Sequence, residues 1–303
     1  MAATTRSSAF FSFGVPALFV WLWSTGFIGA KYGLPYAEPF TLLSIRMLIT
    51  LCLLGVLAWV MKVRWPGWRG AGHLAIIGVL VHGCYLGGVY YAIQDGMPSG
   101  IISLIVGLQP LVTSAAAIVL LGERVSVKQW LGLTLGLMGV CLVLIEKFGL
   151  SSSEGGFPIW TLAWALLSLG GISLGTVYQK SRGTGADLVA GTLIQYSAAA
   201  MFFTIGAFAF ETREVTWALP LILSMAWLVF GVSIGAILLL MWLIRRGAAS
   251  QVASLFYLVP PVTALEAFLL FDERLGLLAM AGGVLSITGV ALVVSRPRAK
   301  STG

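Results

Sequence analysis

The sequence is poor in charged residues, which make up 10% of its 303 positions, whereas hydrophobic residues make up 59%. Soluble domains carry about 25% charged residues, so a chain with so few charges cannot cover a water-facing surface. Long unbroken apolar runs take the place of the polar–apolar alternation that transmembrane β-strands need. Since a helix needs about 20 apolar residues to cross the hydrocarbon core, the composition predicts a bundle of membrane-spanning helices.

Residues that carry metal binding and catalysis are also scarce, with three cysteines and two histidines in the whole chain. Cys52, Cys84 and Cys141 lie within apolar runs and match no metal-ligand spacing, so we interpret them as small hydrophobic residues. The sequence contains no nucleophile elbow, no His-Glu-x-x-His and no phosphate loop. We therefore expect no catalytic residue, no metal and no cofactor.

The net charge of +7 does not indicate a nucleic-acid partner, because the basic residues form short clusters between apolar runs. In a membrane protein such clusters mark the cytoplasmic side. Most Lys and Arg residues fall on the side that carries the N-terminus, and few, such as Lys31 and Arg213, fall on the other. This bias predicts that both termini are cytoplasmic and that the number of helices is even.

Charged residues, prolines and glycines divide the chain into ten apolar segments, joined by connections too short to hold a soluble domain. The longest connection contains Ser-Ser-Ser-Glu-Gly-Gly and is typical of a linker between two halves. We expect helices at residues 14–33, 38–61, 71–93, 98–121, 127–146, 159–180, 187–210, 219–245, 248–271 and 275–295.

The two halves of the chain repeat a set of residues at a nearly constant offset. A unit of five helices is odd in number, so its second copy must enter the membrane from the opposite side. Inverted repeats are a recurring design of transporters, because the two units can exchange roles between inward-open and outward-open states. A duplication retained only for folding is the alternative. The matched pairs include Ser99 and Ser250, Pro110 and Pro260, Thr113 and Thr263, and Glu123 and Glu273.

The predicted fold class is therefore an all-α membrane protein of ten transmembrane helices in two inverted five-helix repeats, with both termini cytoplasmic. A separate soluble domain is not expected anywhere in the chain. The expected organisation is a cytoplasmic N-terminal segment at 1–13, the first repeat at 14–146, a linker at 147–158, the second repeat at 159–295 and a cytoplasmic tail at 296–303.

A set of short motifs resembles the EamA-type drug/metabolite transporter superfamily over essentially the whole chain. The motifs are Trp23-Ser24-x-Gly26-Phe27 with Lys31, Glu38-Pro39 with Arg46, and the Glu-Arg turns at 123–124 and 273–274. Within the superfamily the chain is most similar to bacterial inner-membrane exporters of amino acids, including the aromatic amino-acid type. The resemblance implies a multi-pass secondary transporter. The helices lack the cationic cluster expected of relatives that carry sugar phosphates or nucleotide sugars.

Ionisable residues inside a membrane helix are functional candidates, because they are costly in hydrocarbon. His82 lies near the middle of the third predicted helix, and Tyr85 follows three residues later on the same face. The imidazole could bond a substrate carboxylate or cycle a proton, and we take both residues as substrate-binding candidates. A structural histidine that bonds a neighbouring helix is an equal alternative.

Arg46 in the second predicted helix and Glu266 in the ninth are candidates for gating or coupling. Arg46 could bind a substrate carboxylate or pair with Glu266 or Glu38, and the family pattern favours a structural or gating role. Glu266 lies near the outer end of its helix and could bind a proton. A partly solvated carboxylate in an outer vestibule is equally consistent with that position.

Prolines occupy corresponding positions in the fourth and ninth predicted helices, at Pro110 and at Pro260-Pro261. Proline removes a backbone donor and frees a carbonyl in the preceding turn, and matched broken segments indicate a binding site near the bilayer midplane. We therefore predict that the neighbouring Gln109 and Tyr257 line a substrate site and that the prolines allow bending during gating. A simple kink is the alternative.

Trp23, like Tyr85 and Tyr257, lies deeper than the aromatic residues at the helix ends and could stack on an aromatic or cationic substrate. Core filling is the alternative for each of the three. Small residues on the fifth and tenth predicted helices, such as Gly139 and Gly289, allow close helix packing. We expect this packing inside a monomer, with a dimer as the alternative.

The function that we predict is export of amino acids, aromatic and other neutral ones included, or of related small metabolites. Alternating access through a cavity between the repeats would move them, and the first, third, fourth, sixth, eighth and ninth helices would line it. The expected partners are a small-molecule substrate and the lipid bilayer. An intramembrane lipid-modifying enzyme, an exporter of another metabolite or drug class and a channel are the alternatives. Proton antiport and facilitated diffusion both stay open.

Overall fold

The computed structural model describes residues 14–121, 127–149, 157–183, 185–236, 239, 243 and 255–294. Within these ranges the structure is helical, and its one extended pairing is an isolated antiparallel bridge between Ala37 and Val215. The all-α prediction is therefore confirmed for the part of the chain that is described.

The first half contains helices close to all five predicted segments. The third predicted helix is composite, because a π-helical stretch separates two α-helices, and the fourth is interrupted at Gly107–Leu108. The elements are α2 (Val15–Gly33), α3 (Pro39–Met61), α4 (Trp68–Gly78), η2 (Val79–Cys84), α5 (Tyr85–Gln94), α6 (Ser99–Val106), α7 (Gln109–Leu121) and α8 (Val127–Gly149).

The second half follows the same plan. Its third predicted helix again contains a π-helical stretch, and a short 3₁₀ turn precedes the helix that carries Pro260 and Pro261. Residues 248–254 of the ninth predicted helix lie outside the described ranges. The elements are α9 (Thr161–Arg182), α10 (Leu188–Phe210), α11 (Leu219–Ala226), η3 (Trp227–Ala236), η4 (Phe256–Leu258), α14 (Val259–Phe271) and α15 (Leu277–Val294).

Within the described ranges, five continuous helices are long and apolar enough to cross a membrane, and further apolar helices are shorter. The prediction of ten spans with cytoplasmic termini goes beyond this finding and stays a prediction. The five long helices are Pro39–Met61, Trp68–Gln94, Thr161–Arg182, Leu188–Phe210 and Leu219–Ala236.

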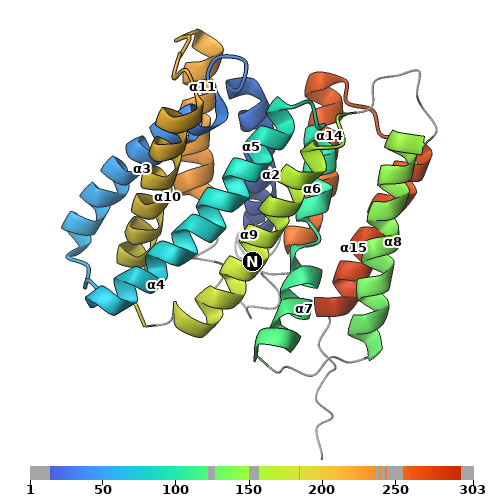
Figure 1. Cartoon of the computed structure of the whole chain (residues 1–303), viewed down its shortest axis with the longest axis horizontal. Helices are drawn as coiled ribbons and strands as arrows, with labels where there is room; N and C mark the ends of the chain where they lie inside the picture. Colours follow the sequence, from blue (N-terminus) through green and yellow to red (C-terminus); the bar gives the residue numbers. More distant parts are fainter. Residues whose placement is uncertain are drawn as a thin grey trace, which may run out of the picture.

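Successive helices run up and down the bundle, with α3, α4 and α10 on one side and the pair α8–α15 on the other (Figure 1). In the α8–α15 pair, a Cβ at Gly139 would collide with the backbone of Gly282 and with Ser286. The Ser286 hydroxyl also donates to the backbone oxygen of Gly136, 3.3 Å away. The small-residue faces of these helices are thus used inside the chain, while the oligomeric state stays a prediction.

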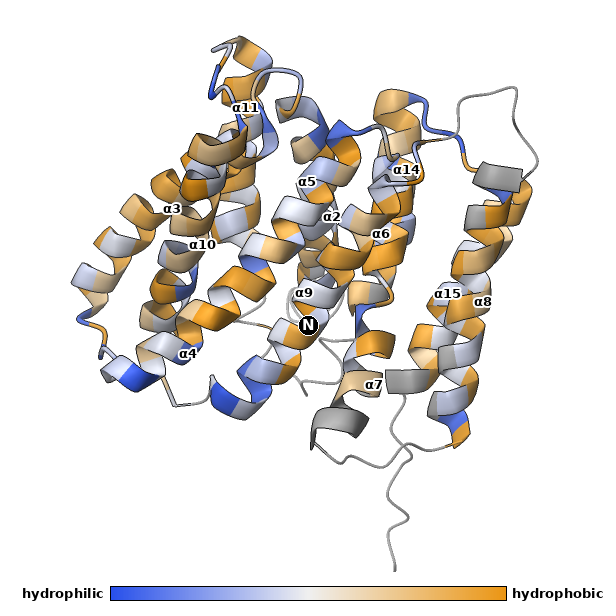
Figure 2. Ribbon diagram, in the orientation of Figure 1, coloured by the Kyte–Doolittle hydropathy of each residue, from blue (hydrophilic) through white to orange (hydrophobic). Residues whose placement is uncertain are grey.

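Apolar side chains cover both the inside and the outside of the bundle. Figure 2 shows hydrophobic residues along the helices and the most hydrophilic residues mainly at the two ends. Leu166, Met201 and Leu269 are each more than 60% exposed, which is unfavourable in water but matches the hydrocarbon of a bilayer. Inside, Phe19 and Phe203 are fully buried.

Two glutamates hold the start of α3 against the end of α10. Glu211 accepts hydrogen bonds of 2.7 Å from the backbone nitrogens of Phe40 and Thr41. The first backbone N–H groups of a helix have no partner within it, so this buried carboxylate satisfies them. In return, Glu38 accepts from the backbone nitrogen of Thr212 at 2.7 Å. These bonds fix the end of the helix that carries Arg46.

Candidate functional site

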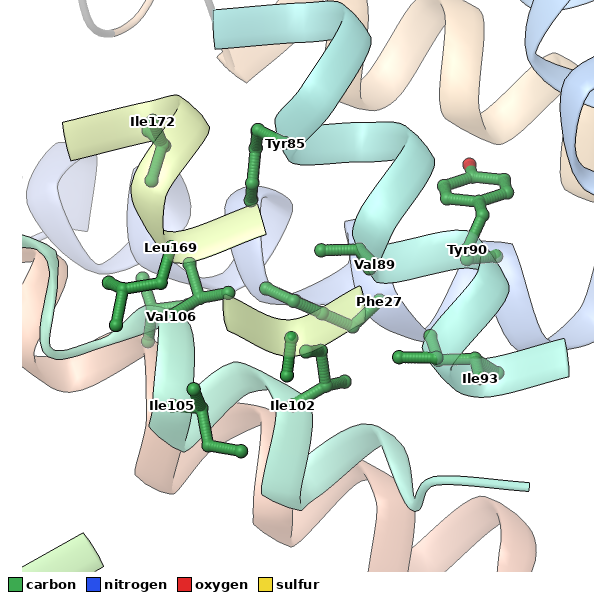
Figure 3. Close-up of a cluster of buried hydrophobic side chains, with 14 of the residues drawn as sticks. Phe27, Tyr85, Val89, Tyr90, Ile93, Ile102, Ile105, Val106, Leu169 and Ile172 are labelled. Carbon is green, nitrogen blue, oxygen red and sulfur yellow. The ribbon is translucent and has the colours of Figure 1, made fainter. Parts of the chain in front are cut away.

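A cavity of about 580 Å³ lies in the middle of the bundle, between helices of both halves. The six helices that were predicted to line it do so where they are described, in α2, η2–α5, α7, α9, η3 and η4. Two further helices, α3 and α10, contribute Arg46 and Tyr196. The cavity lining continues into the hydrophobic core, because Phe27, Tyr85 and Ile172 belong to both (Figure 3).

Four of the five predicted substrate-binding residues line this cavity, namely Trp23, His82, Tyr85 and Gln109. The fifth, Tyr257, has a side chain outside the described part of the structure, although its neighbour Phe256 lines the cavity. The structure thus brings together residues from α2, η2, α5 and α7, and their role in binding stays a prediction.

The gating candidates are spread more widely. Arg46 and Pro110 line the cavity. Pro260 is buried where the backbone at Gly107 comes close, and Pro261 is exposed. Glu266 is absent from the cavity lining and contacts Ser24 of α2 instead.

Arg46 is 4% exposed and forms a hydrogen-bonded cluster at the cavity wall. Its Nη1 donates to the hydroxyl of Tyr90 at 3.1 Å, and its Nε and Nη2 donate to Ser233 Oγ at 3.2 and 3.1 Å. The suggested pairing with Glu266 or Glu38 is wrong, because those carboxylates bond Ser24 and Thr212. In the described chain no carboxylate lies within ion-pair distance of this guanidinium.

The π-helical stretch η2 positions His82 and Tyr85. A π turn shifts the helix register locally and occurs often at functional sites, and here both side chains reach the cavity. Gly171 of α9 permits this arrangement, since a Cβ there would lie 2.8 Å from the backbone oxygen of Leu80. The His82 ring packs on Tyr196 with 4.5 Å between ring centroids.

A second π-helical stretch, η3, occupies the corresponding helix of the other half and carries Val232 and Ser233 to the same cavity. Sequence reasoning missed both π-helical stretches, and it also missed Tyr90, Tyr196 and Ser233 as parts of the site. Nothing in the local hydrophobic pattern distinguishes a π turn from an α turn. The third and eighth predicted helices occupy corresponding positions in the two repeats. This correspondence was the one signal in the sequence that could have indicated that both helices contribute to the same site.

The predicted breaks near the paired prolines are present in the structure. In the first half α6 ends at Val106 and α7 begins at Gln109, so Pro110 lies in a first turn, where its missing N–H costs nothing. In the second half Pro260 has the same position in α14. In the first half Pro110 therefore starts a new helix after an interruption, whereas in the second half Pro260 follows a 3₁₀ turn that leads directly into α14.

Two contacts join parts of the cavity wall that come from different segments. Gln109 Nε2 donates to Thr176 Oγ1 at 3.1 Å, which links the first half to the second across the site. On another wall Trp23 and Phe256 meet edge to face, with ring centroids 5.0 Å apart. Among the described residues, the cavity lining therefore combines the Arg46 guanidinium, several hydroxyl and amide groups and an aromatic wall, and it includes no Asp or Glu.

Comparisons with known proteins agree with this architecture. A Bacillus subtilis protein named as a transporter, YvbV, is 30% identical over 292 residues, which cover 94% of this chain and 92% of the relative. An Escherichia coli protein named as a probable amino-acid metabolite efflux pump is 29% identical over 295 residues, with coverage of 93% and 94%. One crystal structure shares the fold with a TM-score of 0.63 and 20% identity, covering 92% of this chain and 94% of that one.

The family model matches the chain twice, once in each half. The model of the EamA-like transporter family matches residues 13–145 and again residues 159–295. The resemblance inferred from the sequence motifs is confirmed, and the chain is a multi-pass protein of the bacterial inner membrane. The chain belongs to the EamA-like transporter family.

Proposed function

We propose that the protein exports amino acids and related small metabolites by alternating access through the central cavity. The observation that carries this proposal is Arg46, a buried guanidinium that lines the cavity without a carboxylate partner among the described residues. A buried charge without a counter-ion is unfavourable, and a substrate carboxylate would supply one. Guanidinium has five N–H donors, of which Tyr90 and Ser233 engage three.

The rest of the cavity lining suits the other parts of an amino acid. Oxygen atoms of Gln109, Thr176 and Gln179 can accept hydrogen bonds from an ammonium group. Trp23 and Phe256 offer an apolar surface to the substrate side chain. The volume of about 580 Å³ falls within the range of about 300–1,000 Å³ that is common for small-molecule sites. The printed name of the Escherichia coli relative supports the same substrate class.

The transport cycle that we propose uses two inverted five-helix units, at 14–146 and 159–295, with a linker at 147–158 and both termini in the cytoplasm. The paired breaks before Pro110 and Pro260 are where each unit would bend. The cavity between the units would then open alternately to either side. This use of the repeats favours transport over the lipid-modifying enzyme.

An ionic link joins the two units at one end of the bundle. The ammonium of Lys31, at the end of α2, pairs with Glu273, in the turn after α14. The same carboxylate accepts from the hydroxyl of Ser99 at 3.0 Å and from the backbone nitrogen of Gly100 at 3.3 Å, at the start of α6. Under the proposed orientation this link holds the outer end shut and must break for substrate to leave.

The experiment that tests the function measures efflux from proteoliposomes loaded with labelled phenylalanine, threonine or methionine. Saturable efflux that unlabelled amino acids inhibit is the expected result. Phenethylamine, which lacks the carboxylate, should compete far less than phenylalanine. No efflux from demonstrably folded protein would refute amino-acid export and direct attention to another substrate class, while non-saturable flux would indicate a channel.

A further inference from the structure

Glu266 and Ser24 meet between α14 and α2 in an arrangement that indicates a proton. Ser24 is 0% exposed, and its Oγ lies 2.9 Å from Glu266 Oε1 and 2.8 Å from the backbone oxygen of Trp21. A serine hydroxyl has one hydrogen, so it can donate to one of these oxygens but not to both. If Glu266 carries a proton on Oε1, it donates to Ser24 while Ser24 donates to Trp21, and both short contacts are satisfied.

The second carboxyl oxygen of Glu266 favours the same protonated form. Oε2 is buried and has no hydrogen-bond partner among the described residues. An ionised carboxylate with one oxygen left without a donor is very unfavourable at such a place, whereas the carbonyl oxygen of a neutral acid costs much less. The hydroxyl of Thr263, one turn earlier on α14, is buried and without a partner too, so it does not compensate a charge on Glu266.

Cations near α14 are engaged elsewhere. The nearest candidate on α2, Lys31, pairs with Glu273. Along α6 and α15, which pack on α14 and η4, no side chain is titratable. Three other titratable sites lie on these elements or at the end of α14. Tyr32 packs on Phe271, and the side chain of Tyr257 lies outside the described part. Asp272 and Arg274 form an exposed pair. Glu266 thus has no described counter-ion.

We infer that Glu266 is a proton-binding site and that the exporter exchanges its substrate for a proton. This inference rests on the proposed export function and names its coupling ion. One proton binds one carboxylate to form the neutral acid that packs against Ser24. The ionised carboxylate cannot remain in that interface, so it favours the conformation in which α2 and α14 separate and water reaches the group. One proton then moves inward for each substrate molecule that moves outward.

The proton site is joined to the substrate cavity through α2. Ser24 lies directly after Trp23 and shortly before Gly26 and Phe27, and these three residues line the cavity. A shift of α2 on loss of the proton therefore moves the substrate-binding wall. The link between Lys31 and Glu273 joins α2 to the end of α14 a second time, so both contacts must open together.

The test compares wild-type protein with Glu266→Gln and Ser24→Ala, and it uses Glu214→Gln as a matched control because Glu214 is exposed in the 211–218 connection. Proteoliposomes loaded with labelled phenylalanine are diluted into buffer of equal pH or of lower external pH. Wild type and Glu214→Gln should release substrate faster with acid outside. Glu266→Gln should lose this response while substrate exchange at equal pH continues, and Ser24→Ala should weaken the response.

A spectroscopic measurement makes the inference independent of the substrate. Infrared difference spectra between wild type and Glu266→Gln at neutral pH should contain the C=O stretching band of a protonated carboxylic acid. A Glu266→Gln protein that keeps its gradient response, or a difference spectrum without that band, would overturn the inference. Saturable wild-type efflux that ignores the pH gradient would overturn proton exchange yet leave amino-acid export standing. Absence of all efflux would refute the export function, and the band alone would then decide whether Glu266 holds a proton.

Discussion

Replacing Arg46 with glutamine should weaken the binding of carboxylate-bearing substrates. The substitution removes the guanidinium from the cavity wall and leaves a neutral amide in its place. A hydrogen bond to a charged group contributes about 1.5–3 kcal/mol, and each 1.4 kcal/mol corresponds to about tenfold in affinity. We therefore expect KM for phenylalanine efflux to rise by about 10- to 100-fold.

The conservative change Arg46→Lys should have a smaller effect in the same direction. An ammonium group keeps the charge but cannot bind Tyr90, Ser233 and a bidentate carboxylate at once. We expect KM to rise by about tenfold in this variant. The order wild type, lysine, glutamine is therefore the expected order of decreasing affinity.

The assay must separate lost binding from lost folding. Glutamine leaves the buried groups of Tyr90 and Ser233 without their donor, which costs about 1–3 kcal/mol of stability. Thermal melting of the purified variant measures that cost, and phenethylamine serves as the internal reference because it has no carboxylate to lose. Arg69→Gln is the matched control, since Arg69 lies on α4 beside Trp68 and does not line the cavity.

The result that would refute the reasoning is an unchanged KM for phenylalanine in a folded Arg46→Gln protein. Equal losses for phenylalanine and phenethylamine would also count against it, because they would indicate a distorted cavity rather than a lost carboxylate partner. Loss for phenylalanine alone would establish Arg46 as the carboxylate-binding residue.

Three further changes test other parts of the structure. Glu211→Ala should lower the stability by about 2 kcal/mol because α3 loses its cap, and an unchanged Tm would contradict this. Gly139→Ala should destabilise the α8–α15 pair by about 1–3 kcal/mol. Gly170→Ala should not, because a Cβ there meets no atom within 4 Å. Equal Tm values for the two variants would reject the packing argument. Lys31→Glu should slow efflux, because repulsion from Glu273 keeps the outer end from closing again after each release, and adding Glu273→Lys should restore part of it; a double variant as slow as the single one would argue against the ionic link.

Much of the architecture could be predicted because it depends on quantities that are local in the sequence. Apolar runs, prolines and charged turns located the helices to within a few residues wherever the structure describes them, since a segment without β-alternation can satisfy its backbone groups in hydrocarbon only as a helix. The offset between Pro110 and Pro260 revealed the repeat, and the family match in each half agrees with it. The same offset, together with the helix-breaking property of proline, also indicated irregular helix geometry near both prolines.

The candidate site could be predicted only in part. His82, Tyr85, Gln109 and Trp23 attracted attention because polar or large aromatic groups deep in a membrane helix need a reason. Ser233 carries no such signal, because a single serine in an apolar helix is easily accommodated, whereas Tyr196 is a deep tyrosine like Tyr85 that the same reasoning passed over. Their place in the site depends on the neighbours that each helix meets.

The sequence by itself determined the class of the protein, the position of its helices and its two-fold repeat, because hydropathy and periodicity act over a few turns of one chain segment. The tertiary structure alone decided the partners. It turned Arg46 toward Tyr90 and Ser233 rather than toward a glutamate, and it set Glu266 against Ser24, far away in the chain. Those pairings follow from how the helices cross and from the π turns that rotate side chains into the cavity, and helix crossings involve surfaces from both halves at once.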